Sequence, residues 1–440
     1  MSPDTAPVEW ALTLHRDDVP AAVRRHAELL VADAIAVSVA GRPAPASRIA
    51  AEHAAAVFPG TDARSLLDDR PLGVVGAAWA NAVLANVLDL DDGHRLTKGH
   101  PGAIVVPAML AVAQARDATL AELHEAVVVA YEIAVRAGIA LHERDSTYHA
   151  SGAWGALGVA AGAARLLGLD ADRTVHALGL ADYHAPIAPI MRSCAQPEMT
   201  KDACDVGARL GVEASLLAGR GFTAVSADHD LDRPPWDDLG ERWRLTEAYL
   251  KAYPCCRWTQ GAIRAALQAR ERAGVTADAI ERVEIRTFAA ADGLSHEVPT
   301  TTEQAQYNIV WPVAHALCHG DFDVPAVLGP FDDAGALRLH GRTSVVVDPE
   351  LTAAFPARRL TAVALTLADG RRIATDPCEA RGEPEDPEWD AIVRDKVARL
   401  VDPTRGTATA PDPALRLGAL DAAQLVDALA PSAVGAAAPA

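Results

Sequence analysis

Acidic side chains and histidines are concentrated in residues 86–102, which read NVLDLDDGHRLTKGHPG. The titratable groups with catalytic potential in this segment are Asp89, Asp91, Asp92, His94 and His100. Histidine changes charge near neutral pH and is the side chain that most often moves protons in enzymes. A neighbouring carboxylate can orient such a histidine. The segment therefore predicts an acid/base site, and the alternative is a solvated loop that caps helices.

Apolar sequence lies on both sides of this segment. Residues 76–88 consist almost entirely of Ala, Val, Leu and Trp, and residues 103–113 are nearly as apolar. A helix that is hydrophobic all round is usually buried. Charge beside buried helices is costly unless it is paired or used. We therefore expect a charged loop between two buried helices.

The elements that must position this loop are predicted to be helical through the first 250 residues. Asp18 and Pro20 resemble a helix start, and apolar residues then recur every three or four positions up to Gly41. Thr119 and Glu122 form a capping-box pattern that opens a long helix to about Leu141. Repeated small residues in 152–167 indicate close helix packing. Further helices are predicted over 47–57, 170–181 and 201–219.

The pattern changes after about residue 254. Residues 280–288 alternate apolar and charged side chains with the period of a half-buried strand. Strands are also predicted over 343–347, 360–367 and 371–375, the last two joined by a hairpin turn at Asp369-Gly370. Helices are predicted over 302–318 with an interruption at Pro312, over 389–400 and over 421–429, and residues 430–440 are predicted to be frayed. This second region is predicted to be an α+β domain.

Composition limits the class of protein. The 440 residues suggest two or three domains, and half of them are apolar, which is enough for a large core. The net charge of −19 argues against a nucleic-acid partner. Six cysteines without a C-x-x-C pair fit reduced thiols. No signal peptide and no apolar stretch of membrane-spanning length is visible, so we expect a cytoplasmic protein without a membrane partner.

A metal site is the first alternative to acid/base chemistry. The three aspartates and two histidines of the segment 86–102 could bind a divalent cation. An aspartate cluster in a helical protein also suggests diphosphate chemistry with magnesium. Against this alternative, no second aspartate-rich helix pairs with the first in the sequence, and the α+β region would have no role. We therefore predict no metal.

Six segments in order resemble the MmgE/PrpD family, which includes 2-methylcitrate dehydratase, cis-aconitate decarboxylase and iminodisuccinate epimerase. The matching segments are residues 86–92 with His100-Pro101, Tyr148-His149 followed by GAWGALG, residues 200–207, residues 251–256, residues 302–308 and residues 376–387. The resemblance covers essentially the whole chain.

This resemblance implies a mainly α fold with a large all-helical domain over 1–253, completed by 388–440, and a smaller α+β lid over 254–387. The active site would lie between the two domains. The resemblance also implies a homodimer that needs no metal or organic cofactor and acts on small anionic carboxylates.

The resemblance also implies roles for individual residues. His149 and His100 would be the acid/base pair, oriented by Asp89, because proton transfer beside a carboxylate needs a positioned base. Lys201 and Lys251 would hold substrate carboxylates and stabilise enolate-like charge. The remaining predicted substrate-binding residues are Asp92, Tyr148, Thr97 and Arg257. His94 is expected to be a solvated loop histidine.

The predicted reaction is the dehydration of a 2-methylcitrate-like di- or tricarboxylate. Epimerisation of an iminodisuccinate-like dicarboxylate is the alternative, because it uses the same proton chemistry. The chain also departs from the family pattern at Asn86, Gly93, Asn308 and Trp311. The departures at Asn86, Gly93 and Trp311 motivate a further alternative, which is a helical interaction scaffold or a relative that has lost activity.

Overall fold

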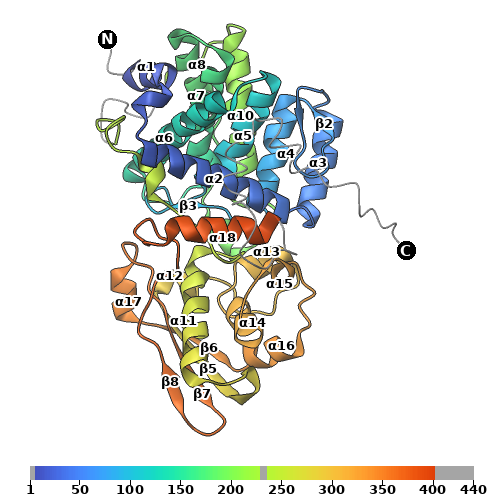
Figure 1. Ribbon diagram of the computed structural model, residues 1–440, viewed down its shortest axis with the longest axis vertical. Helices are drawn as coiled ribbons and strands as arrows, with labels where there is room; N and C mark the ends of the chain where they lie inside the picture. Colours follow the sequence, from blue (N-terminus) through green and yellow to red (C-terminus); the bar gives the residue numbers. More distant parts are fainter. Residues whose placement is uncertain (1–4, 228–234, 402–440) are drawn as a thin grey trace.

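The computed structural model describes residues 5–227 and 235–401 and has two domains (Figure 1). The larger domain is built from helices, and the smaller one combines helices with a four-stranded sheet. The predicted mainly α fold is thus confirmed. The predictions for 421–429 and 430–440 lie outside the described residues. Within the described ranges, no single helix is long and apolar enough to cross a membrane.

The larger domain packs its helices around a central one, α7. Its helices are α1 (Ala6–Thr13), α2 (Ala21–Ala40), α3 (Pro45–Val57), α4 (Val74–Asn86), α5 (Pro101–Ala115), α6 (Leu120–Arg144), α7 (Gly152–Leu167), α8 (Ala171–Tyr183), α9 (Met191–Ala195) and α10 (Cys204–Gly219). The small residues of α7 allow close contact with α5, α6, α8 and α10. A Cβ atom at Gly158 would lie 2.2 Å from the carbonyl oxygen of Ala130. The close packing predicted from the glycines is confirmed.

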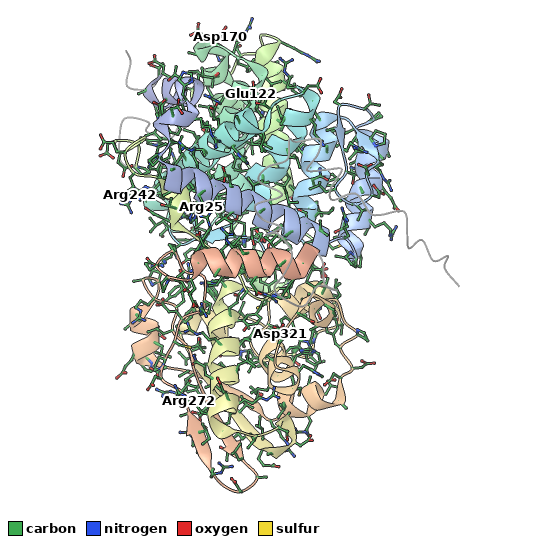
Figure 2. The ribbon with its side chains drawn as sticks, in the orientation of Figure 1. Arg25, Glu122, Asp170, Arg242, Arg272 and Asp321 are labelled. Atoms are coloured by element: carbon green, nitrogen blue, oxygen red, sulfur yellow. The ribbon has the colours of Figure 1, made fainter. Side chains whose placement is uncertain are left out.

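Helices α6 and α8 begin with side-chain caps, whereas α2 does not. The Thr119–Glu122 capping box is present, and Asp170 caps α8 by accepting a hydrogen bond from the Arg173 amide (2.9 Å). Glu122 and Asp170 both lie in the end of the helical domain far from the smaller domain (Figure 2). The predicted start of α2 at Asp18 is wrong. Asp18 instead closes a short 3-10 turn, Arg16–Asp18, by accepting a hydrogen bond from the backbone amide of His15.

The smaller domain is built on a sheet of four strands. These are β5 (Ile280–Thr287), β6 (Thr343–Val347), β7 (Ala362–Leu367) and β8 (Arg372–Ala374), in the order β6-β5-β7-β8. Its helices are α11 (Arg257–Ala273), α12 (Ala289–Asp292), α13 (Thr302–Gln306), α14 (Trp311–His319), α15 (Val324–Leu328), α16 (Ala334–His340) and α17 (Pro349–Ala354). β5 runs parallel to β6 and antiparallel to β7. Val283 and Ile285 are buried while Arg282 and Arg286 are exposed, which confirms the predicted alternation.

Helix α11 packs against β7 and β8. The helix predicted over 302–318 is divided into α13 and α14. Pro312 falls in the first turn of α14, where a missing N–H costs no helical hydrogen bond. The chain between the two helices places Tyr307 at the boundary with the larger domain, where its hydroxyl contacts Asp202.

Helix α18 (Trp389–Val401) lies between the two domains, alongside α2 (Figure 1). Arg25 on α2, near the domain boundary in Figure 2, pairs with Asp390 on α18 at 2.9 Å. Deeper in this contact, the buried Lys396 ammonium lies 2.8 Å from Asp33 of α2 and donates to the carbonyl of Leu90 (2.6 Å). Helix α18 therefore supports the charged segment directly.

Candidate active site

Two very short strands join the charged segment to a distant part of the chain. Strand β3 (Gly93–His94) pairs antiparallel with β4 (Ala248–Tyr249). This pairing brings Asp89 beside Lys251, 162 residues later. The buried Lys251 ammonium donates to the Asp89 side chain (2.7 Å) and to the Asp89 carbonyl (3.0 Å). Asp89 has a positive φ of 52°, a conformation uncommon for residues other than glycine.

A pocket of about 680 Å³, its open mouth included, lies at this junction and is lined by both domains. The predicted site residues that line it are Asp89, His100, Tyr148, Lys251 and Arg257. The sequence-based prediction missed other members of the lining, among them Lys98, Asp202, Tyr249, Tyr307 and Arg359.

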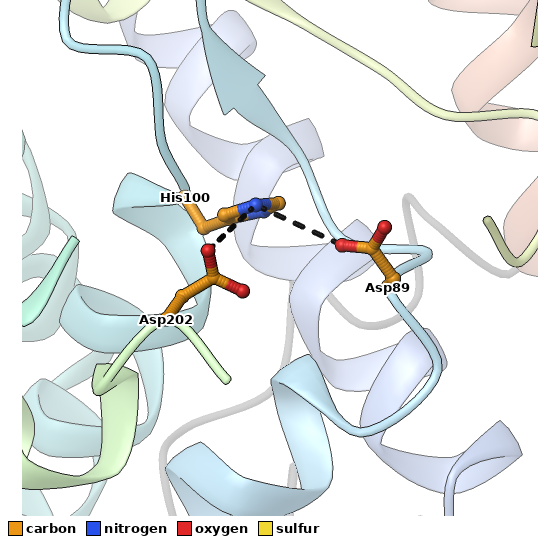
Figure 3. A group of neighbouring side chains, drawn as sticks. All are labelled: Asp89, His100 and Asp202. Carbon is orange, nitrogen blue, oxygen red and sulfur yellow. Dashed lines mark ion pairs between the residues drawn. The ribbon is translucent and has the colours of Figure 1, made fainter. Parts of the chain in front are cut away.

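His100 lies among three carboxylates at one end of this pocket. Its Nδ1 atom is 2.9 Å from Asp91 Oδ2. Its Nε2 atom is 3.7 Å from Asp89 Oδ1 and 3.6 Å from Asp202 Oδ1 (Figure 3). Burial and the Lys251 charge lower the pKa of His100, but Asp91 and Asp202 outweigh them and raise it to about 9. His100 is therefore an imidazolium at neutral pH.

The neighbouring charges are consistent with this state. Burial raises the pKa of Asp91, but the charge of His100 outweighs it and holds the Asp91 pKa well below its usual range. Asn86 also donates to Asp91 (3.3 Å). Burial lowers the pKa of Lys251, whereas Asp89 and Asp91 raise it above its ordinary value. His100 and Lys251 thus place two positive charges directly beside the carboxylates of Asp89 and Asp91.

Asp202 is the main acidic residue that sequence reasoning missed. It lies just before α10 and accepts a hydrogen bond from the hydroxyl of Tyr307 (3.3 Å). Its backbone carbonyl accepts from the amide of Gly152 at the start of α7 (3.0 Å). The signal was available, because Asp202 follows Lys201 in the segment 200–207 that resembles the family. The sequence-based prediction named Lys201 from this segment and not Asp202.

Lys201 lies behind Asp89, outside the lining of this pocket. The predicted helix over 201–219 begins only at Cys204, so Lys201 precedes it. Its buried ammonium donates to the Asn86 carbonyl (2.7 Å) and to Gln306 (2.8 Å), and lies 4.0 Å from Asp89 Oδ1. In this position Lys201 adds positive charge next to Asp89. Direct contact with substrate remains a prediction.

Two predicted substrate-binding residues are occupied by structural contacts. Asp92 accepts hydrogen bonds from the Gly102 amide (2.8 Å) and the Tyr131 hydroxyl (3.0 Å), so it stabilises the start of α5. Burial and the Asp91 charge raise the pKa of Asp92 to about 7. Thr97 is fully buried, and its methyl group packs at Gly138 of α6. Neither side chain lines the pocket.

The expectation of a solvated His94 is wrong. His94 is fully buried because it lies in the β3–β4 pair, where its Nε2 atom is 3.6 Å from Glu247. Burial lowers the pKa of His94. His94 is therefore a buried structural residue of the charged segment.

His149 is buried beside the pocket, but its ring is not part of the lining. Its neighbour Tyr148 reaches the pocket. The His149 Nε2 atom is 3.2 Å from Asp145, and Nδ1 has no hydrogen-bond partner within the described part of the chain. The predicted acid/base role of His149 remains a prediction.

Among residues 5–227 and 235–401, one group of side chains has the spacing to hold a cation. Ligand atoms of Asp89, His100 and Asp202 lie within 4.8 Å of one another. This donor set fits a divalent ion poorly, because the Lys251 ammonium is 2.7 Å from the same Asp89 oxygen and would repel the ion. The other members of the cluster considered as a metal site, Asp91, Asp92 and His94, have the separate contacts described above.

Comparison with known proteins agrees with the fold. The MmgE/PrpD N-terminal domain matches residues 8–231, and the MmgE/PrpD C-terminal domain matches residues 253–411. The chain is 26% identical to a cis-aconitate decarboxylase of Aspergillus terreus over 284 residues, which is 58% of each chain. It is 26% identical to that of Mus musculus (57% of this chain, 56% of the relative) and 25% identical to that of Homo sapiens (the same shares). The alignments thus span somewhat more than half the length of these relatives. Both domain models match in order along the chain, and the chain belongs to the MmgE/PrpD family.

Proposed function

We propose that this protein is a lyase that needs no cofactor and eliminates water from a small di- or tricarboxylate, with His100 as the proton donor. The observation that carries the proposal is the position of His100 between Asp91 and Asp202 in a pocket shared by both domains, where these carboxylates favour its protonated form. A charged donor with a pKa somewhat above neutral is protonated at neutral pH and can still release its proton. The family relationship supports lyase chemistry at this site.

In the proposed reaction, the Asp202 carboxylate removes a proton from the carbon beside a substrate carboxylate. The bond between the neighbouring carbon and its hydroxyl breaks, and the electron pair leaves with the oxygen. His100 gives its Nε2 proton to that oxygen, and water departs. The proton on Asp202 then returns to His100, whose Nε2 atom is 3.6 Å away, and the site is reset.

Asp202 is preferred as the base because Asp89 is more strongly engaged. Asp89 is paired with the Lys251 ammonium at 2.7 Å, whereas Asp202 accepts a longer hydrogen bond from Tyr307 (3.3 Å). Lys251 faces the pocket and would stabilise the negative charge that develops on the substrate carboxylate. His149 is the second candidate for the base, because its Nδ1 atom is unpaired within the described ranges.

Decarboxylation is a second candidate reaction, favoured by the similarity to cis-aconitate decarboxylases. A protonated His100 could donate to the carbanion that remains after carbon dioxide leaves. Epimerisation would use the same groups without loss of mass.

The reaction is tested by incubating the enzyme with a panel of hydroxy-, amino- and unsaturated di- and tricarboxylates in deuterated water, followed by mass spectrometry. The proposal predicts a product that has lost water. Loss of carbon dioxide would assign a decarboxylase, and deuterium uptake without loss of mass would assign an epimerase. If no compound reacts, the proposed activity is wrong.

The roles are tested with variants on the compound found in this way. His100→Asn and Asp202→Asn should each reduce kcat by about 10²-fold or more, because each removes a proton-transfer group. Glu198→Gln, an exposed change four residues from Asp202, is the control. Lys201→Ala is also expected to lose most turnover, because it removes a positive charge next to Asp89, whereas His149→Ala tests the second candidate for the base. An active Asp202→Asn enzyme together with an inactive His149→Ala enzyme would move the base from Asp202 to His149.

A further inference from the structure

The wall of the pocket contributed by the smaller domain is basic. Arg257 begins α11, and Arg359 lies between α17 and β7. The two guanidinium groups lie 4.6 and 5.1 Å from the centre of the Tyr249 ring. Lys98, on the charged segment, lies 4.1 Å from the centre of the Tyr148 ring. All of these side chains line the same pocket as His100.

Both Nη atoms of Arg257 are engaged by the protein itself, although its buried Nε atom has no hydrogen-bond partner among the described residues. Its Nη1 atom donates to the Leu250 and Arg381 carbonyls (2.6 and 2.9 Å). Its Nη2 atom donates to Glu383 (2.8 Å), which also accepts from Arg95 (2.9 Å). These contacts make Arg257 a structural link between the start of α11 and the segment before α18.

Arg359 is not satisfied in the same way. Its Nη1 atom is 3.9 Å from Glu383, too far for a hydrogen bond. Its buried Nε and Nη1 atoms have no hydrogen-bond partner within residues 5–227 and 235–401, although the side chain is only 11% exposed. A buried N–H group without an acceptor is costly, and the cost is larger for a charged group. Glu383 is already shared between two other arginines, so the wall keeps an excess of positive charge around Arg359.

We propose that Arg359 binds a second carboxylate of the substrate, remote from the reacting carbon, and thereby selects polycarboxylates. A planar guanidinium can hold a carboxylate with two hydrogen bonds, which suits Arg359, because its Nε and Nη1 atoms have no acceptor among the described residues. The opposite end of the pocket carries Asp89 and Asp202, which would repel a second carboxylate. The basic wall is therefore the place for it, and Lys98 adds a further positive charge there.

This inference rests on the proposed function. It names the residue that would hold the second carboxylate of the substrate. The substrate carries one carboxylate beside the carbon that loses its proton, near Lys251. It carries another at Arg359, so that a single small molecule contacts both domains.

The test uses isothermal titration calorimetry with two unreactive probes. Tricarballylate carries three carboxylates, and butyrate carries one. The variants are Arg359→Met and Arg359→Lys, and the matched control is Arg358→Met. Arg358 is the neighbouring residue, 60% exposed and paired with Glu379. Thermal melting checks that each variant is folded.

Wild-type protein should bind tricarballylate more tightly than butyrate. Arg359→Met should weaken tricarballylate binding about 10- to 100-fold, because a charge-assisted pair of hydrogen bonds is lost. Butyrate binding should not change, and Arg358→Met should behave like the wild type. Arg359→Lys should fall between Arg359→Met and the wild type, because lysine keeps the charge without the planar fork.

The inference is overturned if wild-type protein does not prefer tricarballylate, or if both Arg359 variants bind it as the wild type does. Equal losses for both probes would also overturn it, since a remote carboxylate would then have no part in the effect. The proposed function fails separately. Arg359-dependent binding without turnover of any compound would contradict the lyase and leave the inference standing. Turnover that depends on His100 but not on Arg359 would support the lyase and overturn the role of Arg359.

Discussion

The charge state of His100 is determined by neighbours that are close in space and only partly close in sequence. The sequence predicted His100 and Asp89, because histidine and carboxylate types are concentrated in residues 86–102. It did not predict that Asp91 holds Nδ1 while Asp202 faces Nε2. Asp202 comes from a different loop, and its approach depends on how α7 and α10 pack.

The pKa of His100 predicts a pH dependence of stability. The folded value is about 9 and the ordinary value is 6.5, so folding favours the protonated ring. The stabilisation is fully present below pH 6.5 and is lost as pH rises through about 9. We expect a contribution on the order of 1–3 kcal/mol. The melting temperature of the wild-type protein should therefore fall further between pH 6.5 and 9 than that of His100→Asn.

The change in melting temperature of His100→Asn is subtracted from that of the wild type. This subtraction removes the contribution of groups that titrate alike in both proteins. Equal losses in the two proteins would contradict the assigned charge.

Departures from the family pattern have structural explanations at the residue scale. Asn308 accepts hydrogen bonds from the Val310 and Trp311 amides (2.9 and 2.7 Å) and so caps α14. Trp311 is buried in the core of the smaller domain beside Phe331. Tyr307, four residues before Trp311, does line the pocket, together with Tyr148 and Tyr249. These substitutions therefore do not require the alternative of an inactive scaffold.

At the scale of elements, the pairing of β3 with β4 places Tyr249 in the lining of the pocket. A Cβ atom at Gly93 would lie 2.4 Å from the Tyr249 ring, so only glycine allows the ring to take this place. Sequence patterns predicted the long helices and the alternating strand β5 because those signals are local. Two-residue strands have no periodicity, so β3 and β4 could not be predicted.

Gly93→Ala should displace Tyr249 and with it the neighbouring arginines. We expect a loss of about 1–3 kcal/mol from overpacking, together with a loss of turnover. The measurements are chemical denaturation and the assay above. Gly341→Ala is the control, because the nearest atom to its Cβ would be 3.6 Å away.

In a Tyr249→Ala background, Gly93→Ala should cost little. If it costs as much there as in the wild type, the ring is not the source of the strain.

At the scale of the whole molecule, α18 connects the end of the described chain to the site. Lys396 reaches from α18 to Asp33 and to the carbonyl of Leu90, one residue after Asp89. The sequence predicted the helix over 389–400, but its buried partner lies more than 300 residues away and left no local signal. The homodimer remains a prediction, which sedimentation can test.

Lys396→Met should leave Asp33 as an uncompensated buried charge. We expect a loss of about 3–5 kcal/mol of unfolding free energy, measured by denaturant unfolding. Arg399→Met is the matched control on the same helix, because Arg399 is exposed and its ion pair with Asp395 lies at the surface.

Asp33→Leu combined with Lys396→Met should recover part of the loss, since no charge is then left buried. A double variant as unstable as Lys396→Met alone would show that the ion pair is not what makes Lys396 important.

The most direct test of the account is an NMR titration of His100 in protein labelled with ¹³C at its histidine rings. His100→Asn assigns the resonance among the 15 histidines. The account predicts a His100 pKa of about 9, and therefore a charged ring at neutral pH that is ready to donate a proton. A pKa at or below the ordinary value of 6.5 would contradict it, because His100 would then be neutral in the resting enzyme and could not be the proton donor.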